Sequence, residues 1–249
     1  MCCFSRRVNR VADTNIFARG SSEGRQFLVY SMLISAGEDL AMILPIPVPL
    51  MSKEDSVRFI NLEKYPEFFR DLHSGFPPKV TAAPAGRTKS FAVKKAPLKV
   101  VDVGSFEASF VPTIKDFDRL DERFRLPADV WFNLPQYKDY GFVVFKLRKG
   151  TEQRVHPMAF EFPRAKPHQL FFPTVHIHDG KVHRQARFDH TLYCQSGPDE
   201  DLQIVHWEES PQPAGMFMKM NKAQGLIDEA RHCYRRGLHG SFKNEDQFV

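Results

Sequence analysis

Residues Thr174 to Cys194, TVHIHDGKVHRQARFDHTLYC, contain the strongest local folding signal in the chain. Asp179-Gly180 stands between two β-rich runs, and a type I′ turn favours this pair because the turn needs positive φ at both central residues. A two-residue turn would pair the runs as a hairpin, with His176 opposite His183. Side chains alternate between the two faces of a strand, so His176, His178 and His183 would share one face. The stretch therefore predicts a β-hairpin with one imidazole-rich face and one apolar face.

The imidazole-rich face is a candidate metal site. Neutral imidazole is a good ligand for zinc and other divalent transition metals. We expect His176, His178 and His183 to bind the ion, with His190 or Cys194 as the fourth ligand. Three ligands with an open position would make a catalytic site, whereas four ligands including Cys194 would make a structural one. The alternative is that these histidines form the solvated face of an ordinary hairpin. Four other histidines are expected to lie away from the ion: His73, His156, His168 and His239.

The N-terminal Cys2 is a second candidate, as a catalytic nucleophile. If Met1 is removed, Cys2 has both a thiol and an α-amino group that can serve as its base, as in N-terminal-nucleophile hydrolases. The alternative is that Cys2 and Cys3 are two exposed or metal-associated thiols. The other cysteines stand alone in the sequence, so no disulfide framework is predicted.

Composition limits the class of protein. The chain has 249 residues, of which 42% are hydrophobic and 26% charged, with a net charge of +5, which are globular proportions. The basic residues are scattered, so we expect no nucleic-acid partner. The longest apolar run, residues 40–51, is broken by three prolines and is shorter than the roughly 20 residues of a membrane helix. The start of the chain has no secretory signal pattern, and a cytoplasmic protein without a membrane partner is expected.

The pattern along the chain predicts an α+β fold. Residues 26–34 and 142–148 are apolar runs typical of buried strands, and alternating prolines in residues 41–49 indicate an edge strand or a strand that leaves the sheet at Pro45. Residues 221–237 have helical apolar spacing and end in glycine, which predicts a C-terminal helix packed on the sheet.

One domain of residues 1–237 is expected, with a mostly antiparallel sheet and short inserted helices. A Pro/Ala/Lys-rich stretch at 77–97 would form a loop, and residues 238–249 would form a frayed tail. The alternative is a pair of β-rich halves that meet near residue 97.

Several motifs occur in an order that resembles an uncharacterised bacterial domain family. These are the opening CCF, the strand AMILPIPVP, and later YKDYGFVVFKLRKG and VHPMAFEFP, within residues 2–178. Members of that family open with Cys-Gly-Gly and have a Trp-x-Leu-Pro-x-Pro strand, followed by a Tyr-x-x-x-Gly-x-x-Phe-x-x-x-Lys-Leu strand. This chain departs from the pattern at Cys3 and at Met42, which replaces the tryptophan. The resemblance implies a mixed α+β fold and no particular activity.

Two kinds of function remain open from the sequence. The first is a metal-binding protein or a metal-dependent enzyme centred on the histidine hairpin, or, as an alternative to it, a hydrolase that uses Cys2 as its nucleophile. The second is a non-catalytic module that binds a protein partner. The second rests on the proline-rich strand and the Pro/Lys-rich loop, both of which suit docking.

Overall fold

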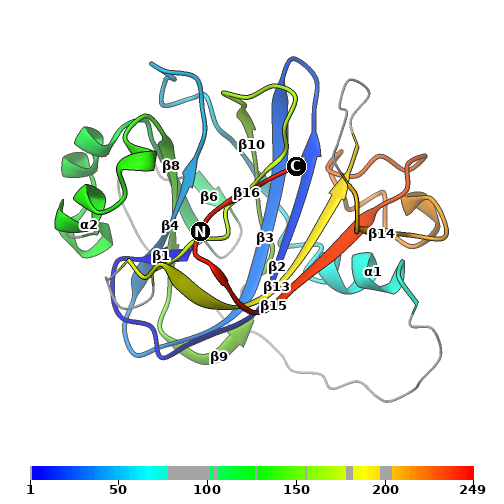
Figure 1. Ribbon diagram of the computed structural model, residues 1–249, viewed down its shortest axis with the longest axis horizontal. Coiled ribbons are helices and arrows are strands. Elements are labelled where there is room, and N and C mark those ends of the chain that lie inside the picture. The colour runs from blue at the N-terminus through cyan, green and yellow to red at the C-terminus, as the bar shows by residue number, and fades with distance from the viewer. Residues whose placement is uncertain are drawn as a thin grey trace.

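The computed structural model describes residues 2–77, 101–103, 106–126, 128–154, 156–177, 182–196 and 204–249, and it gives the backbone alone for residues 2, 101–103, 128–129 and 151–154. Strands make up most of its regular structure, and the helical segments are short (Figure 1). The fold is therefore mainly β, and the predicted α+β class is wrong. Apart from Pro77, the stretch expected as a loop at 77–97 lies outside the described residues.

The first of two large sheets, sheet A, contains the N-terminal strand as an interior member. Its order is β12 (His176–Ile177), β1 (Cys2–Phe4), β4 (Leu40–Ile46), β8 (Gly141–Leu147), β7 (Phe106–Val111) and β6 (Val101–Val103). All neighbours are antiparallel except β1 and β12. The proline-rich strand β4 is thus interior rather than an edge. Its ladder with β1 ends at Ile43, before Pro45, so the missing amide proton of the proline interrupts no pairing on that side.

The second sheet, sheet B, faces sheet A. Its order is β14 (Glu208–Glu209), β15 (Tyr234–Lys243), β13 (Gln185–Gln195), β2 (Arg10–Gly20), β3 (Arg25–Ala36), β10 (Met158–Pro163) and β5 (Arg58–Asn61), with β9 (Gly150–Arg154) also paired to β3. Strands β2 and β13 are parallel, and the other pairs are antiparallel. A β-bulge interrupts β2 between Ala12 and Asn15.

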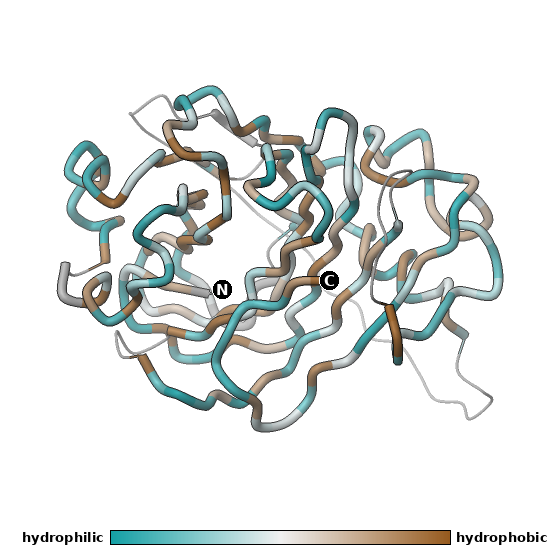
Figure 2. The backbone as a smooth tube through the Cα atoms, turned by 45° about the horizontal axis from the view of Figure 1, so that its top comes forward, coloured by the Kyte–Doolittle hydropathy of each residue, from teal (hydrophilic) through white to brown (hydrophobic). Residues whose placement is uncertain are grey.

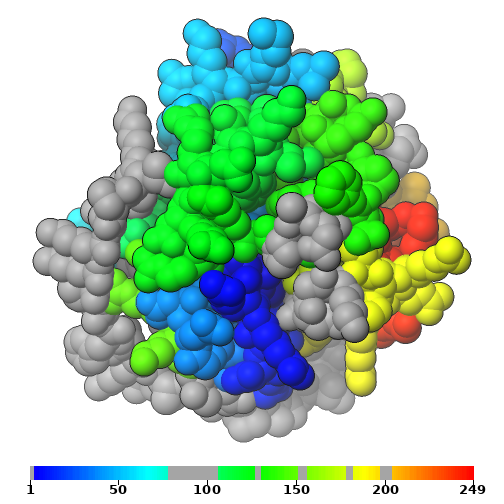
Figure 3. All heavy atoms as spheres, turned by 90° about the vertical axis from the view of Figure 1, so that its left-hand side faces the viewer, coloured from blue at the N-terminus to red at the C-terminus, as the bar shows by residue number. Residues whose placement is uncertain are grey.

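Apolar side chains form three layers around the two sheets. The largest cluster lies between the sheets and includes Phe145 and Phe160, whose ring centroids are 6.1 Å apart. A second cluster covers the outer face of sheet A under the 3-10 helices η1 (Ile114–Arg119), η2 (Glu122–Phe124) and η3 (Pro135–Tyr137) and helix α2 (Ala128–Phe132). Figure 3 shows this helical layer on the side that faces away from sheet B.

The third cluster covers the outer face of sheet B. It packs helix α1 (Phe68–Ser74) and the segment around η4 (Ala214–Met216) against Phe17, Val29 and Tyr193 of the sheet. Brown apolar stretches therefore run through the strands in Figure 2, with teal polar stretches at the loops. Each sheet is covered on both sides, which explains why strands such as β3 and β8 consist of nearly continuous apolar residues.

The predicted C-terminal helix at 221–237 is absent. Gln224 and Gly225 have left-handed φ angles of +49° and +76°, which break any helix there. The apolar residues that suggested the helix, such as Leu226 and Ile227, are nevertheless buried. The side chain of Gln195 accepts a hydrogen bond from the Asp228 amide at 2.9 Å and donates one to the Asp228 carbonyl at 2.9 Å, so it satisfies backbone groups without a helix.

The end of the chain is paired rather than frayed. Strand β15 continues to Lys243, and β16 (Gln247–Phe248) pairs with β11 (Phe171–Phe172). The backbones of Val249 and Leu170 exchange two hydrogen bonds of 2.8 and 2.9 Å. In the described part of the chain, no helix is long and apolar enough to cross a membrane.

Candidate functional site: a histidine groove between the sheets

A groove opens where β2 and β13 separate. Their ladder begins at Thr14 and His190, and the bulge of β2, between Ala12 and Asn15, lies at the same point. Asp13 has a left-handed φ of +48°, and its amide donates to the Asp189 carboxylate at 3.0 Å, which holds the bulge in place. The resulting space is about 370 Å³. Its walls come from β2, β12 and the start of β13: Val11, Ala12, Thr14, His176, His183, Gln185, Ala186, Arg187, Asp189 and His190.

Two histidines meet at this groove from opposite sheets. His176 lies on β12 of sheet A and His190 on β13 of sheet B, and their Nε2 atoms are 3.2 Å apart. His190 is buried, with 1% of its surface exposed, whereas His176 is half-buried. The Phe188 ring packs against both imidazoles, at centroid distances of 4.6 and 5.3 Å. The pair therefore joins the edge strand of sheet A to an interior strand of sheet B, beside the Phe188 ring and the groove.

Two side chains of the C-terminal segment fix the backbone of the His176 strand. Asn244 accepts a hydrogen bond from the His176 amide at 2.7 Å and donates to the His176 carbonyl at 3.0 Å, much as a neighbouring strand would. Asp246 accepts from the amides of Thr174 and Val175 at 2.8 and 3.1 Å. We call these two residues the Asn244–Asp246 latch. It sets the position of His176 without a further strand.

The latch also reaches the outer layer of sheet A. The Tyr137 hydroxyl donates to the second carboxylate oxygen of Asp246 at 2.5 Å. Burial and the neighbouring Asp246 charge raise the pKa of Tyr137, so the phenol stays protonated and remains a donor. The latch residues gave no signal in the sequence, because side-chain bonds between distant segments follow no period.

The structure brings together part of the predicted ligand set. His176 and His190 are in contact, and the exposed His183 lines the same groove. Cys194 is four residues beyond His190 on β13 and lies buried in the core. His178 and the predicted turn at Asp179-Gly180 lie outside the described residues.

The pairing of His176 differs from the predicted hairpin. Its strand, β12, pairs in parallel with β1, and the register places His176 beside Cys2. Within the residues the structure describes, no group of three or more histidine, cysteine or acidic side chains is placed to hold one ion. The four-ligand metal site and the Cys2 nucleophile both stay predictions.

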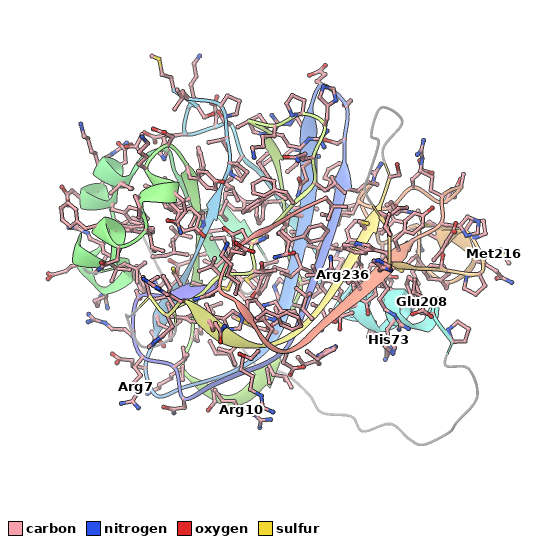
Figure 4. All side chains as sticks on the ribbon, in the orientation of Figure 1. Arg7, Arg10, His73, Glu208, Met216 and Arg236 are labelled. Carbon is pink, nitrogen blue, oxygen red and sulfur yellow. The ribbon has the colours of Figure 1, made fainter. Side chains whose placement is uncertain are left out.

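A histidine that was expected to be a bystander takes part in a separate polar cluster. His73 of α1 contacts the Tyr193 hydroxyl at 3.2 Å and Arg235 at 3.4 Å, and Arg235 forms an ion pair with Glu208 at 2.6 Å. Figure 4 shows the labelled His73 and Glu208 at the α1 side of the molecule, away from Arg10 at the lower end. Burial, followed by the Arg235 charge, lowers the pKa of His73. The cluster ties α1 to the outer face of sheet B.

A second surface feature is an exposed apolar turn after β4. Leu50 and Met51 are 73% and 95% exposed, and Met51 has a left-handed φ of +63°. The Ser52 hydroxyl and amide both donate to the Pro49 carbonyl, at 2.7 and 3.3 Å, which closes the turn. We call residues 49–52 the Leu50–Met51 turn. It presents two large apolar side chains to solvent on a hydrogen-bonded turn.

Comparisons with known proteins bear on the fold. The sequence matches no protein-family model and no curated protein sequence. The crystal structure of baculovirus P35 matches 97% of this chain and 96% of the P35 chain, with a TM-score of 0.50 and 13% identity. The chain shares its fold with baculovirus P35. A mutated P35 after caspase cleavage matches with a TM-score of 0.47, 13% identity and coverage of 96% and 97%. P35 in a caspase-8/P35 complex matches with a TM-score of 0.43, 13% identity and 95% of each chain.

Proposed function

We propose that this chain is a protein-interaction module that acts by binding another protein. The shared fold with P35 supports this proposal, because P35 itself occurs in a complex with caspase-8. The fold alone does not select a partner for this chain. The proposal therefore needs a surface on this molecule that suits protein contact.

The Leu50–Met51 turn is the observation that carries the proposal. Large apolar side chains at an exposed position are typical of the central contacts in protein interfaces, and methionine adapts well to a partner surface. A left-handed φ at a residue other than glycine costs energy that the fold must compensate, which points to a role for the conformation of Met51. Because the Ser52 hydrogen bonds already close the turn, binding would need to order less of its backbone.

Purified caspase-8 is the first probe, since P35, which shares this fold, occurs in a complex with it. The measurement is the dissociation constant of wild type by biolayer interferometry, beside that of Leu50→Ser/Met51→Ser. We expect the double variant to bind at least about tenfold more weakly, which is typical for loss of a central apolar contact. Val205→Ser/Met216→Ser is the matched control, because Val205 and Met216 are also exposed, at 66% and 70%, but lie elsewhere. Equal affinity of both double variants for caspase-8 would show that the Leu50–Met51 turn is not part of the interface.

A second arm identifies a partner other than caspase-8. A photo-crosslinking amino acid at position 51 is compared with the same group at position 216 in an extract of the cells in which the protein occurs. The proposal predicts one protein that crosslinks to position 51 in a fixed ratio and is displaced by unlabelled wild type. It fails if caspase-8 does not bind and no protein crosslinks specifically to position 51.

A further inference from the structure

We propose that His176 and His190 together bind a divalent transition-metal ion, such as zinc, where the edge strand β12 of sheet A meets β13 of sheet B. The proposal concerns a different part of the molecule from the Leu50–Met51 turn and does not depend on the proposed function. It narrows the site to two imidazoles that the structure places side by side. Two features of the pair carry it, namely the spacing of the nitrogens and access from the groove.

The spacing of the two nitrogens suits one ion. Imidazole nitrogens lie 2.0 to 2.1 Å from zinc, so two ligands in a tetrahedral arrangement are roughly 3.3 Å apart. The Nε2 atoms of His176 and His190 are 3.2 Å apart. Their ring centroids are 4.7 Å apart with planes at 39°, so the rings tilt toward each other instead of meeting head to head. An ion could therefore take both lone pairs after a small rotation of the two rings.

The groove supplies access to the two imidazoles. It opens beside both imidazoles, so water can complete the coordination shell. His183 and the carboxylate of Asp189 line the same groove, and Arg187 is the cationic side chain among its walls. A neutral imidazole pair without metal can share one proton in a single N–H···N hydrogen bond. A metal bound to both Nε2 atoms would replace that hydrogen bond. The proton on the donating Nε2 would then move to the Nδ1 atom of the same ring.

The two histidines are anchored in different ways, so metal binding can be detected through the stability of the fold. His190 belongs to a long strand of sheet B, whereas His176 belongs to a two-residue edge strand of sheet A that the Asn244–Asp246 latch holds. A bound ion would link the sheets in the folded state only. It would therefore raise the melting temperature in a manner that depends on metal concentration.

The test uses untagged protein stripped with chelator and then titrated with zinc chloride by isothermal calorimetry, together with thermal melts. We expect about one zinc ion per chain in wild type and a higher melting temperature with zinc. In His176→Ala and in His190→Gln, the binding of one zinc ion and the rise in melting temperature should both be lost. The affinity for zinc should fall at least about tenfold. Binding should also weaken as the pH falls through the range, roughly 6 to 7, in which imidazole takes up a proton.

His239→Ala is the matched control, because His239 lies on the neighbouring strand β15 but pairs with Asp189 and is 58% exposed. It should bind zinc as wild type does. Because the buried His190 contributes to the core, the half-buried His176 decides the result if His190→Gln fails to fold. The proposal is overturned if wild type binds no zinc at 100-fold excess over protein, or if His176→Ala binds zinc as tightly as wild type.

Discussion

Strand β13 and strand β12 are held to their neighbours in different ways. Strands β13 and β15 are joined by a backbone ladder of ten residue pairs, from Gln185 and Lys243 to Cys194 and Tyr234. The edge strand β12 has only two residues and depends on the Asn244–Asp246 latch. A ladder divides its stability among many equivalent bonds, whereas the latch concentrates it in two side chains. Single substitutions should therefore have large effects at the latch and small effects along the ladder.

Removal of the latch carboxylate should have the largest effect. Asp246→Ala leaves the Tyr137 hydroxyl and two amides without their acceptor, and the amides belong to Thr174 and Val175, which are 0% and 1% exposed. Each buried donor left unsatisfied costs about 1 to 3 kcal/mol, so we expect a loss of about 4 kcal/mol in the free energy of unfolding. Urea denaturation measures it. Asp246→Asn keeps an acceptor and should lose clearly less; an equal loss would mean that the bonds are not the cause.

The second latch residue should matter less. Asn244→Ala removes the hydrogen bonds to both backbone groups of His176, and His176 is half-buried, so water can replace part of them. We expect a loss of about 2 kcal/mol. Amide hydrogen exchange should show faster exchange at residues 174–177 than in wild type, with little change along β13. Uniform acceleration in both regions would show that the latch is not a local device.

The His73 cluster should make stability depend on pH. The folded state holds the pKa of His73 below its usual value, chiefly through burial and then through Arg235, so the unfolded chain takes up a proton first. The contribution is complete above about pH 6.5 and is lost as the pH falls from there through the lowered pKa. His73→Gln should flatten this part of the curve of unfolding free energy against pH. An unchanged slope in that variant would assign the acid sensitivity to other groups.

A substitution along the ladder should have the smallest effect. His239 contacts the Asp189 carboxylate at 3.2 Å, and both side chains are about 60% exposed. Such exposed pairs contribute about 0 to 1 kcal/mol, and ladder bonds from the backbone remain in place. We expect His239→Ala to change the free energy of unfolding by about 0.5 kcal/mol or less. A loss of unfolding free energy comparable to that of Asn244→Ala would show that the β13–β15 ladder and the Asn244–Asp246 latch do not differ in this way.

The strongest strands could be predicted from the sequence, because burial on both faces leaves a continuous apolar run. Residues 26–34 lie within β3, and residues 142–148 overlap β8. The helix at 221–237 could not be excluded, since Leu226 and Ile227 are buried as the spacing indicated. Their burial occurs in a turn-rich segment in which Gln195 supplies the hydrogen bonds that a helix would make internally.

The sequence selected two histidines that the structure brings into contact, and their role as metal ligands stays a prediction. His176 and His190 were chosen from their residue types, and their contact across two sheets is consistent with that choice. The predicted hairpin would place His176 opposite His183, whereas β12 pairs with β1, and the predicted turn lies outside the described residues. The bonds of Asn244 and Asp246 connect positions about 70 residues apart and leave no pattern in the sequence.

The parallel pairing of β2 with β13 also constrains how the protein is made. Asp13 and the Asp189 carboxylate that fixes its bulge are separated by 176 positions. At a synthesis rate of roughly 5 to 20 residues per second, the ribosome needs about 9 to 35 s to deliver the second strand after the first. During this interval β2 can pair with β3, and β3 with β10, but the edge of β2 that β13 covers in the folded protein stays open. We therefore expect folding to be completed after translation and chaperone depletion to reduce the soluble yield of the nascent chain.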